Sequence, residues 1–255
     1  MKKVIVTTSW DDGAVQDLRL LKLLNKYNLK GTFYIPQTIA FEPKKGKPLK
    51  RVSEKDILEI AKIQEIGAHG ITHTYLDKLN KEQIYNEVKG SKDWLEKLLN
   101  KKIKMFAYPG GIFNNEIVNS VKKIGFLGAR TTESFKINIE NQFLIGISLQ
   151  CYPYLLSNKE WTLLFQLKTL WKRFKFNLKG VSDLKLPIDS LFNWTTLAKN
   201  IFKSVLKNGG VFHLYGHSWE IEYYKLWEDL EKIFKYISNR RDVYYLTNSE
   251  VLENL

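Results

Sequence analysis

The chain has 255 residues, of which 44% are hydrophobic and 13% aromatic, so it can bury a sizeable core and is too apolar for global disorder. Its net charge of +13 favours acidic partners, but the lysines are spread along the whole chain, and nucleic-acid binding is not expected as its main function. The one cysteine, Cys151, excludes an internal disulfide and a cysteine-based metal cluster.

The amino terminus, MKKVIVTTSWDDG, begins with lysines but has only a short apolar stretch before polar residues follow. A secretion signal needs roughly 7–15 apolar residues and a small-residue cleavage site. No run of ~18 apolar residues is present in the chain, so no transmembrane helix is expected. These features predict a cytoplasmic protein whose first strand begins at once.

Strands and helices are predicted to alternate along the chain. Strands are expected at residues 3–8, 32–35, 105–108, 126–129, 144–149, 210–214 and 243–245. Helices are expected at residues 16–27, 53–66, 81–99, 115–124, 194–207 and 225–238. Ser53 and Asp56 form a Ser-x-x-Asp signature that is typical of a helix start. Such alternation, with about seven units, predicts a single α/β domain of barrel size, with a parallel sheet inside and helices outside.

Polar clusters follow three of the expected strands, at the sheet edge where parallel α/β folds collect their functional residues. They are Asp11 with Asp12, His69 with His73 after the run EIGA (65–68), and His213 with His217. The four histidines of the chain therefore all fall in two pairs with i, i+4 spacing. Scattered surface or core histidines are not expected to pair in this way.

Each cluster has a simpler explanation when it is taken alone. Two adjacent aspartates before Gly13 are typical turn chemistry, and a histidine pair can be two unrelated polar residues. Together, two imidazoles and one carboxylate predict a site for one divalent cation with positions open to water and substrate. One of the two aspartates then binds the cation, and the other accepts a proton from the water.

The sequence resembles the NodB-like polysaccharide deacetylases, carbohydrate esterase family 4. The family's first motif, of the T-F-D-D-G type, corresponds to SWDDG (9–13), and its second, H-S/T-x-x-H, corresponds to HGITH (69–73). The third motif, of the R-x-P-Y-G type, is matched less closely by FAYPGG (106–111). The resemblance covers roughly residues 3–150 and the region around 210–250.

This resemblance implies a distorted (β/α) barrel of about seven strands that removes N-acetyl groups from amino sugars. It implies one domain over residues 1–255, with an inserted basic aromatic segment at about 152–195. The implied general base is Asp11, and the implied ligands of one divalent ion, expected to be zinc with cobalt, nickel or iron as alternatives, are Asp12, His69 and His73. The third motif, with Tyr108, Pro109 and the backbone N–H of Gly110, is expected to bind the oxyanion and the substrate.

The chain departs from the family pattern at the third-motif arginine, which is replaced by Ala107. Arg130, at the end of a neighbouring strand, is expected to orient the base instead, with an ordinary surface salt bridge as the alternative. The family's fourth motif, Asp with Trp, has no evident counterpart.

The fifth motif, of the Leu-x-x-His type, is matched by LYGH (214–217), so His217 is the expected general acid. His213 is the alternative acid, but its place inside a strand favours a hydrogen-bonded core histidine. Trp219 is expected to form a wall for the acetyl methyl group, unless it only packs in the core or at the rim.

Residues 160–180, EWTLLFQLKTLWKRFKFNLKG, place aromatic and apolar residues at helical spacing among lysines. A basic, tryptophan-rich amphipathic helix can lie in a membrane interface, and the alternative is a helix packed on the barrel with its lysines in water. Membrane contact favours a lipid-linked amino sugar as the substrate, and otherwise a free N-acetylated amino sugar or oligosaccharide is expected.

Other functional classes fit less well. A non-catalytic carbohydrate-binding protein would keep the aromatic residues but would not need the Asp-His-His set. A phosphodiesterase or nuclease would use the positive charge but would usually need more carboxylates or a second metal ion. A deformylase, or another C–N amide hydrolase on the same barrel, is the main alternative, because a fold does not fix a substrate.

Overall fold

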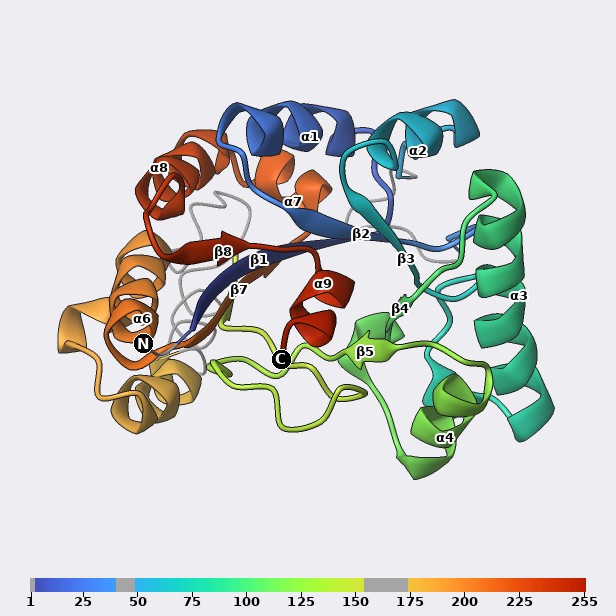
Figure 1. The fold of residues 1–255 in the computed structure, drawn as a ribbon. Coiled ribbons are helices and arrows are strands. Elements are labelled where there is room, and N and C mark those ends of the chain that lie inside the picture. Colours follow the sequence, from blue (N-terminus) through green and yellow to red (C-terminus); the bar gives the residue numbers. More distant parts are fainter. Residues whose placement is uncertain (1–2, 40–48, 154–173) are drawn as a thin grey trace, which may run out of the picture.

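The computed structural model describes residues 3–39, 49–153 and 174–255. These residues form one domain around a curled parallel sheet, with helices on its outside (Figure 1). The strands are β1 (Val4–Asp11), β2 (Gly31–Ile35), β3 (Glu65–Ala68), β4 (Met105–Ala107), β5 (Gly128–Arg130), β6 (Leu149–Gln150), β7 (Gly210–Gly216) and β8 (Val243–Tyr245).

The sheet follows the strand order β5-β4-β3-β2-β1-β7-β6, and every neighbouring pair is parallel. The strand β8 pairs with the first half of β1, on the side where β2 pairs with the second half. Seven strands therefore curl into a distorted barrel, and the predicted fold class is confirmed.

The strand β1 lies inside this sheet, between β2 and β7, and all eight of its residues are buried. Because side chains alternate along a strand, Trp10 faces the outer helices, where the centroid of its ring lies 6.2 Å from that of Phe234 in α8. Ser9 and Asp11 face the other way, into the barrel. A strand that is buried on both faces requires a continuous run without charged residues, which the sequence VIVTTSW provides.

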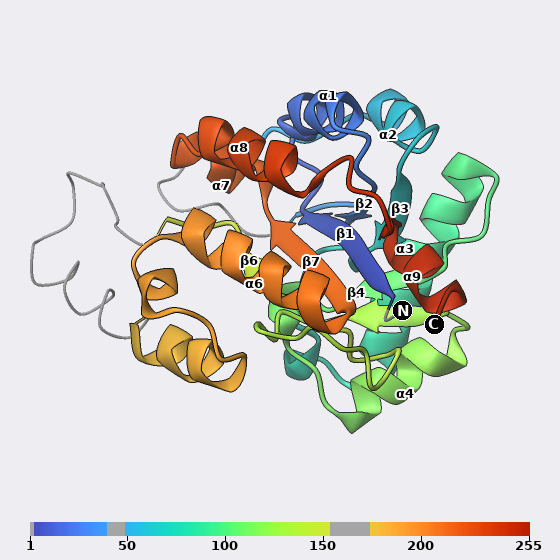
Figure 2. The same ribbon diagram turned by 60° about the vertical axis from the view of Figure 1, so that its left-hand side comes forward.

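Helices cover the outside of the sheet. They are α1 (Asp17–Lys26), α2 (Glu54–Ile60), α3 (Lys81–Leu99), α4 (Asn115–Lys123), α6 (Trp194–Asn208), α7 (Ser218–Tyr223), α8 (Trp227–Ile237) and α9 (Asn248–Glu253), with 3₁₀ turns η1 (Leu76–Lys78), η2 (Pro109–Gly111) and η3 (Ile188–Leu191). Figure 2 shows α6 and α8 beside β1 and β7, whereas α3 and α4 lie at the β3–β5 side in Figure 1. The predicted Ser-x-x-Asp signature forms a complete capping box between Ser53 and Asp56 at the start of α2.

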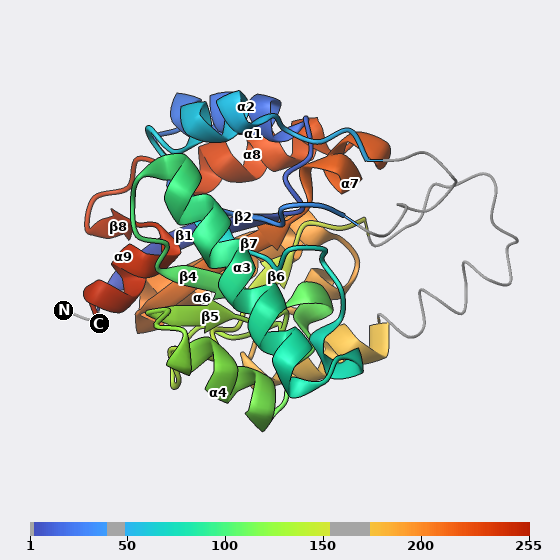
Figure 3. The ribbon, with the colours of Figure 1, turned by 90° about the vertical axis from the view of Figure 1, so that its right-hand side faces the viewer.

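The two edges of the curled sheet are connected by the segment after β5. The amide of Ile145 donates to the carbonyl oxygen of Ala129 at 2.9 Å, and the amide of Ser148 donates to that of His213 at 2.8 Å. This segment therefore passes from β5 to β7 and becomes β6. At the amino ends of the strands, α9 packs against β1, and Figure 3 places the start of β1 and the carboxyl terminus at that end of the molecule.

The bounds of several predicted elements need correction. The helix expected at 53–66 is too long, because α2 ends at Ile60 and β3 begins at Glu65. Between them, the side chain of Gln64 accepts a hydrogen bond from the amide of Gly31 at 2.8 Å, which ties this turn to the start of β2. The strand expected at 144–149 is regular only at Leu149–Gln150, because the segment changes its neighbour from β5 to β7.

The structure describes only part of the predicted insertion at 152–195. Residues 174–183 are helical and η3 follows them, whereas residues 154–173 lie outside the described residues. Most of the amphipathic segment expected at 160–180 therefore also lies outside them. None of the helices in the described part of the chain is long and apolar enough to cross a lipid bilayer.

Candidate active site

Asp12, His69 and His73 meet at the carboxyl ends of β1 and β3. The Oδ1 atom of Asp12 lies 3.3 Å from Nε2 of His73 and 3.9 Å from Nε2 of His69, and one donor atom from each residue lies within 4.8 Å of the others. Donors bound at 2.0–2.2 Å to a tetrahedral ion lie about 3.4 Å apart. The three predicted ligands are therefore close enough to hold one divalent ion.

The buried atoms of this group also fit a cation. Asp12 is 1% exposed, and its Oδ1 accepts no hydrogen bond from any residue that the structure describes. A buried carboxylate oxygen without a donor is costly unless a cation or water satisfies it. Asp12 and His73 both have left-handed backbone, with φ of 80° and 60°, a strain that non-glycine residues rarely adopt and that concentrates at functional sites.

The surroundings of the two histidines favour neutral imidazoles. Nδ1 of His69 lies 2.8 Å from the carbonyl oxygen of Ala107, so it carries the proton, and Nε2 is left with a lone pair directed at the acids. Burial lowers the pKa of His69 to about 4, and burial also lowers the pKa of His73. A neutral imidazole is the form that binds metals.

Glu87 of α3 holds the loop between the two histidines. Its Oε2 accepts hydrogen bonds from the amides of Ile71 and Thr72 at 2.9 and 3.0 Å, and its Oε1 accepts one from the hydroxyl of Thr72 at 2.9 Å. The turn at Gly70 has φ of 81°, and a Cβ atom there would lie 3.1 Å from the same carboxylate. The sequence gives no sign of this role, because a glutamate in an amphipathic helix is normally solvated.

Asp11 is paired with Arg130 inside the barrel. One guanidinium nitrogen of Arg130, Nη2, donates to both carboxylate oxygens of Asp11. Arg130 is 0% exposed and Asp11 is 2% exposed. Burial alone would raise the pKa of Asp11, but Arg130 and then His69 lower it to about 2, so the carboxylate stays ionised. The alternative for Arg130, a surface salt bridge, is wrong because the pair is buried.

His217 approaches from the other side, at the start of α7. Its Nδ1 lies 2.7 Å from Oε2 of Glu220, and its Nε2 lies 3.8 Å from Oδ2 of Asp12. Burial alone would lower the pKa of His217, but Glu220 and then Asp12 raise it to about 9. His217 is therefore a cation at neutral pH whose Nε2 faces the candidate metal site.

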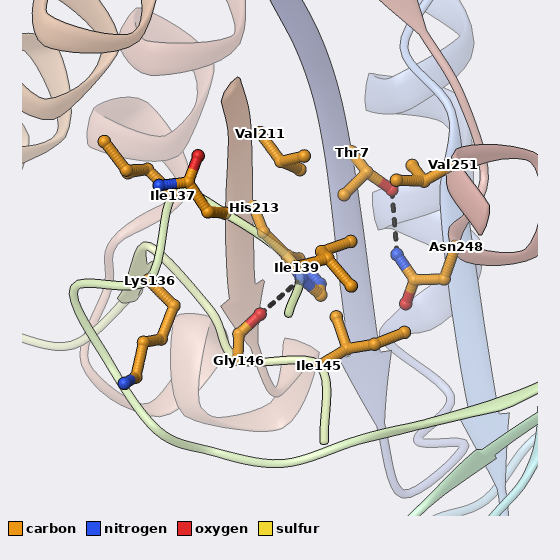
Figure 4. Close-up of a pocket in the computed structure, with 11 residues that line it drawn as sticks. Thr7, Lys136, Ile137, Ile139, Ile145, Gly146, Val211, His213, Asn248 and Val251 are labelled. Atoms are coloured by element: carbon orange, nitrogen blue, oxygen red, sulfur yellow. Dashed lines mark hydrogen bonds between the residues drawn. The ribbon is translucent and has the colours of Figure 1, made fainter. Parts of the chain in front are cut away.

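His213 lies deeper, within β7. Its Nε2 is 2.8 Å from the hydroxyl of Ser9, and its Nδ1 is 3.1 Å from the carbonyl oxygen of Gly146 (Figure 4). Burial lowers its pKa to about 3, so the ring is neutral and both nitrogens are engaged. This is the environment of a hydrogen-bonded core histidine.

A family model described as polysaccharide deacetylase matches residues 1–129, which is half of the chain. The chain belongs to the polysaccharide deacetylase family. The matched residues include the whole Asp-Asp and His-His part of the site. Arg130, His217 and Glu220 lie beyond the matched residues, and their place beside the site comes from the structure.

Curated relatives agree with this family. A peptidoglycan-N-acetylglucosamine deacetylase of Bacillus cereus is 27% identical over 124 residues, which cover 48% of this chain and 54% of that protein. The chain spans about half the length of the curated relatives it matches.

Solved structures extend the likeness over nearly the whole chain. A provisionally assigned polysaccharide deacetylase from Mycobacterium smegmatis superposes with a TM-score of 0.62 at 15% identity, covering 99% of this chain and 90% of that one. A family 4 acetyl xylan esterase from Clostridium thermocellum, in complex with a cobalt ion, gives 0.56 at 16% identity, with 98% and 91% coverage. At such identities the likeness shows a shared fold.

Of the other residues expected at the site, one contacts Asp12 and the others lie in the core or at the surface. Trp219 donates its indole N–H to Oδ2 of Asp12 at 2.9 Å, and so it contacts a candidate ligand. Tyr108 is fully buried, and its hydroxyl donates to the carbonyl oxygen of Phe143 at 3.0 Å, so the phenol belongs to the core. Pro109 is buried, whereas Gly110 is exposed, has φ of 64° and would place a Cβ 2.7 Å from the ring of Tyr75.

Glu220, like Glu87, is a functional candidate that sequence reasoning missed. Its signal was present in HSWE (217–220), because a carboxylate three residues after a histidine reaches it once a helix starts between them. The helix α7 itself was not predicted, so the spacing had no structural meaning in the sequence.

Proposed function

We propose that the protein is a metal-dependent hydrolase that removes N-acetyl groups from a substrate containing amino sugars. The observation that carries this proposal is the donor set of Asp12, His69 and His73 between an ionised carboxylate, Asp11, and a cationic imidazole, His217. Membership of the polysaccharide deacetylase family supports the reaction class.

Asp12, His69 and His73 would hold one divalent ion. Two imidazoles and a carboxylate suit zinc, and also cobalt, nickel or iron. When bound, such an ion supplies a Lewis acid for the amide carbonyl and lowers the pKa of the water that it holds.

Asp11 is the proposed general base. Its pKa of about 2 keeps it ionised at neutral pH, and its Oδ2 lies 3.5 Å from Nε2 of His69, beside the donor set. Arg130 restrains the carboxylate, because its Nη2 donates to both oxygens of Asp11. The carboxylate accepts the proton of the attacking water while Asp12 is left to its ligand role.

His217 is the proposed general acid. Cleavage of the C–N bond requires a proton on the departing nitrogen, and the Nε2 proton of His217 is available because Glu220 holds the ring as a cation. The backbone N–H of Gly110 would donate to the oxyanion. The preceding residues only shape this turn, because Pro109 has no N–H and the N–H of Tyr108 donates to the carbonyl oxygen of Arg130 at 3.2 Å. The ring of Trp219 would form one wall beside the acetyl methyl group.

Membership of the family, and the likeness to a relative named for peptidoglycan N-acetylglucosamine, support the proposed substrate class. We expect an N-acetylated amino sugar or oligosaccharide. Contact with a membrane surface, and hence a lipid-linked sugar, is proposed only from the basic aromatic pattern at 160–180.

The test is acetate release from N-acetylated amino sugars offered free, nucleotide-linked and lipid-linked. We expect release from at least one of them, loss of release with a chelator and recovery with added zinc or cobalt. The Asp11→Asn protein should keep its metal and lose about 10²–10⁴-fold in turnover, because it lacks only the base. Release of formate from matched N-formyl sugars, without acetate, would identify a deformylase instead.

A further inference from the structure

Tyr215 of β7 contacts both sides of the proposed active site. It is 4% exposed and faces Ser9 in the sheet register. Its ring centroid lies 4.5 Å from Cζ of Arg130, the partner of the proposed base. Its hydroxyl oxygen lies 3.1 Å from Nε2 of His217, the proposed acid.

The contact with Arg130 restrains a guanidinium that has few other partners. Nη2 is bound to Asp11, whereas Nε and Nη1 are buried and donate to no residue that the structure describes. The rings of Tyr215 and Tyr34 lie 4.5 and 5.0 Å from Cζ of Arg130. Stacking on aromatic faces stabilises and orients a planar guanidinium, so these rings limit the movement of the group that restrains Asp11.

The contact with His217 restrains its second ring nitrogen. Glu220 fixes Nδ1 at 2.7 Å, but a ring that is held at one nitrogen can still swing its other nitrogen. The hydroxyl of Tyr215 at 3.1 Å supplies the second point, and the two ring centroids lie 5.3 Å apart in an edge-to-face arrangement. Nε2 is the atom that must face the departing amine.

We propose that Tyr215 is a positioning residue that sets the base and the acid relative to each other, through Arg130 on one side and His217 on the other. This inference rests on the proposed function. One buried side chain on β7 then fixes the separation of the proposed base, at the end of β1, and the proposed acid, at the start of α7.

The two contacts can be removed separately. The Tyr215→Phe variant keeps the ring beside Arg130 and loses the hydroxyl, and we expect kcat to fall about tenfold with KM unchanged, since one hydrogen bond is lost. The Tyr215→Leu variant loses both contacts, and kcat should fall ~100-fold. Bound metal should stay near one ion per chain in both.

The matched control is Tyr245→Phe, which removes a tyrosine hydroxyl that donates to the carbonyl oxygen of Ile237 at 2.7 Å, in β8 and outside the site. Its kcat should equal that of the wild type. Equal kcat in wild type and metal-loaded Tyr215→Phe would overturn the inference, as would a fall in kcat that only follows lost metal or lost folded protein.

A crystal structure of Tyr215→Phe and Tyr215→Leu separates this inference from the proposed function. Should the wild type release no acetate at all, the proposed reaction fails, but the positions of the side chains can still be compared. We expect His217 to turn in Tyr215→Phe, and both His217 and Arg130 to move in Tyr215→Leu. Unmoved side chains in both variants would refute a positioning role.

Discussion

His69 and His217 lie on opposite sides of Asp12, and their nitrogens meet different partners. Nδ1 of His69 meets a backbone carbonyl at 2.8 Å, whereas Nδ1 of His217 meets the carboxylate of Glu220 at 2.7 Å. Burial lowers the pKa of His69 to about 4. For His217 the effect of burial is outweighed by Glu220, and its pKa rises to about 9.

This difference shows how one residue type can serve two purposes within a few ångströms. A neutral partner and burial leave an imidazole with a lone pair for a metal ion, while a carboxylate partner leaves it with a proton to donate. The neutral side lies within residues 1–129, which match the family model, and the charged side lies beyond them.

The largest expected effect is on the neutral side. The Asp12→Ala protein should lose its bound divalent ion and all measurable turnover, because one of three protein ligands is gone. Metal per chain, measured by elemental analysis, should fall from about one to near zero. His217→Ala is the control, since it should keep its metal, and full metal content in Asp12→Ala would refute the ligand assignment.

On the charged side, His217→Ala should slow turnover by about 10²–10⁴-fold, because the amine then departs without a positioned acid. Steady-state kinetics of the metal-loaded protein measure this effect. Turnover equal to that of the wild type would assign the acid to another residue.

A smaller change should come from removing the charge that distinguishes the two histidines. Glu220 raises the pKa of His217, so Glu220→Gln should lower it from about 9 toward its ordinary value of 6.5. The acid would lose its proton at lower pH, so the alkaline limb of the pH–rate profile should shift to lower pH. Glu222→Gln, on the same helix but 52% exposed and bonded to Arg19, should leave the limb in place.

The smallest effect on turnover is expected at His213. His213→Asn should lower the free energy of unfolding by about 1–3 kcal/mol, because buried partners lose a hydrogen bond. Since burial holds the pKa of His213 near 3, below its unfolded value, its contribution is complete above pH 6.5 and is lost as the pH falls toward 3.

Denaturant unfolding at several pH values measures this difference. The wild type should lose more stability on acidification than His213→Asn does. If instead His213→Asn removes the alkaline limb of the pH–rate profile, the roles of the two histidines must be exchanged.

The sequence by itself determined the alternation of strands and helices, because apolar spacing and helix caps are local properties. It also indicated the candidate metal-binding residues, since Asp12 and His69 stand directly after strand-forming runs and His73 lies four residues after His69. In a parallel sheet these runs must end at one edge, so neighbouring donors follow from the order of the elements.

Only the tertiary structure decided the partners of the proposed base and the proposed acid. Arg130 reaches Asp11 across 119 residues of sequence, and Tyr215 stacks on it from another strand. Whether an arginine points into the barrel or toward solvent depends on how the sheet curls, and no local pattern encodes that. Tyr108 is the opposite case. It was expected to contact the substrate, but in the folded chain its hydroxyl donates to the buried carbonyl oxygen of Phe143.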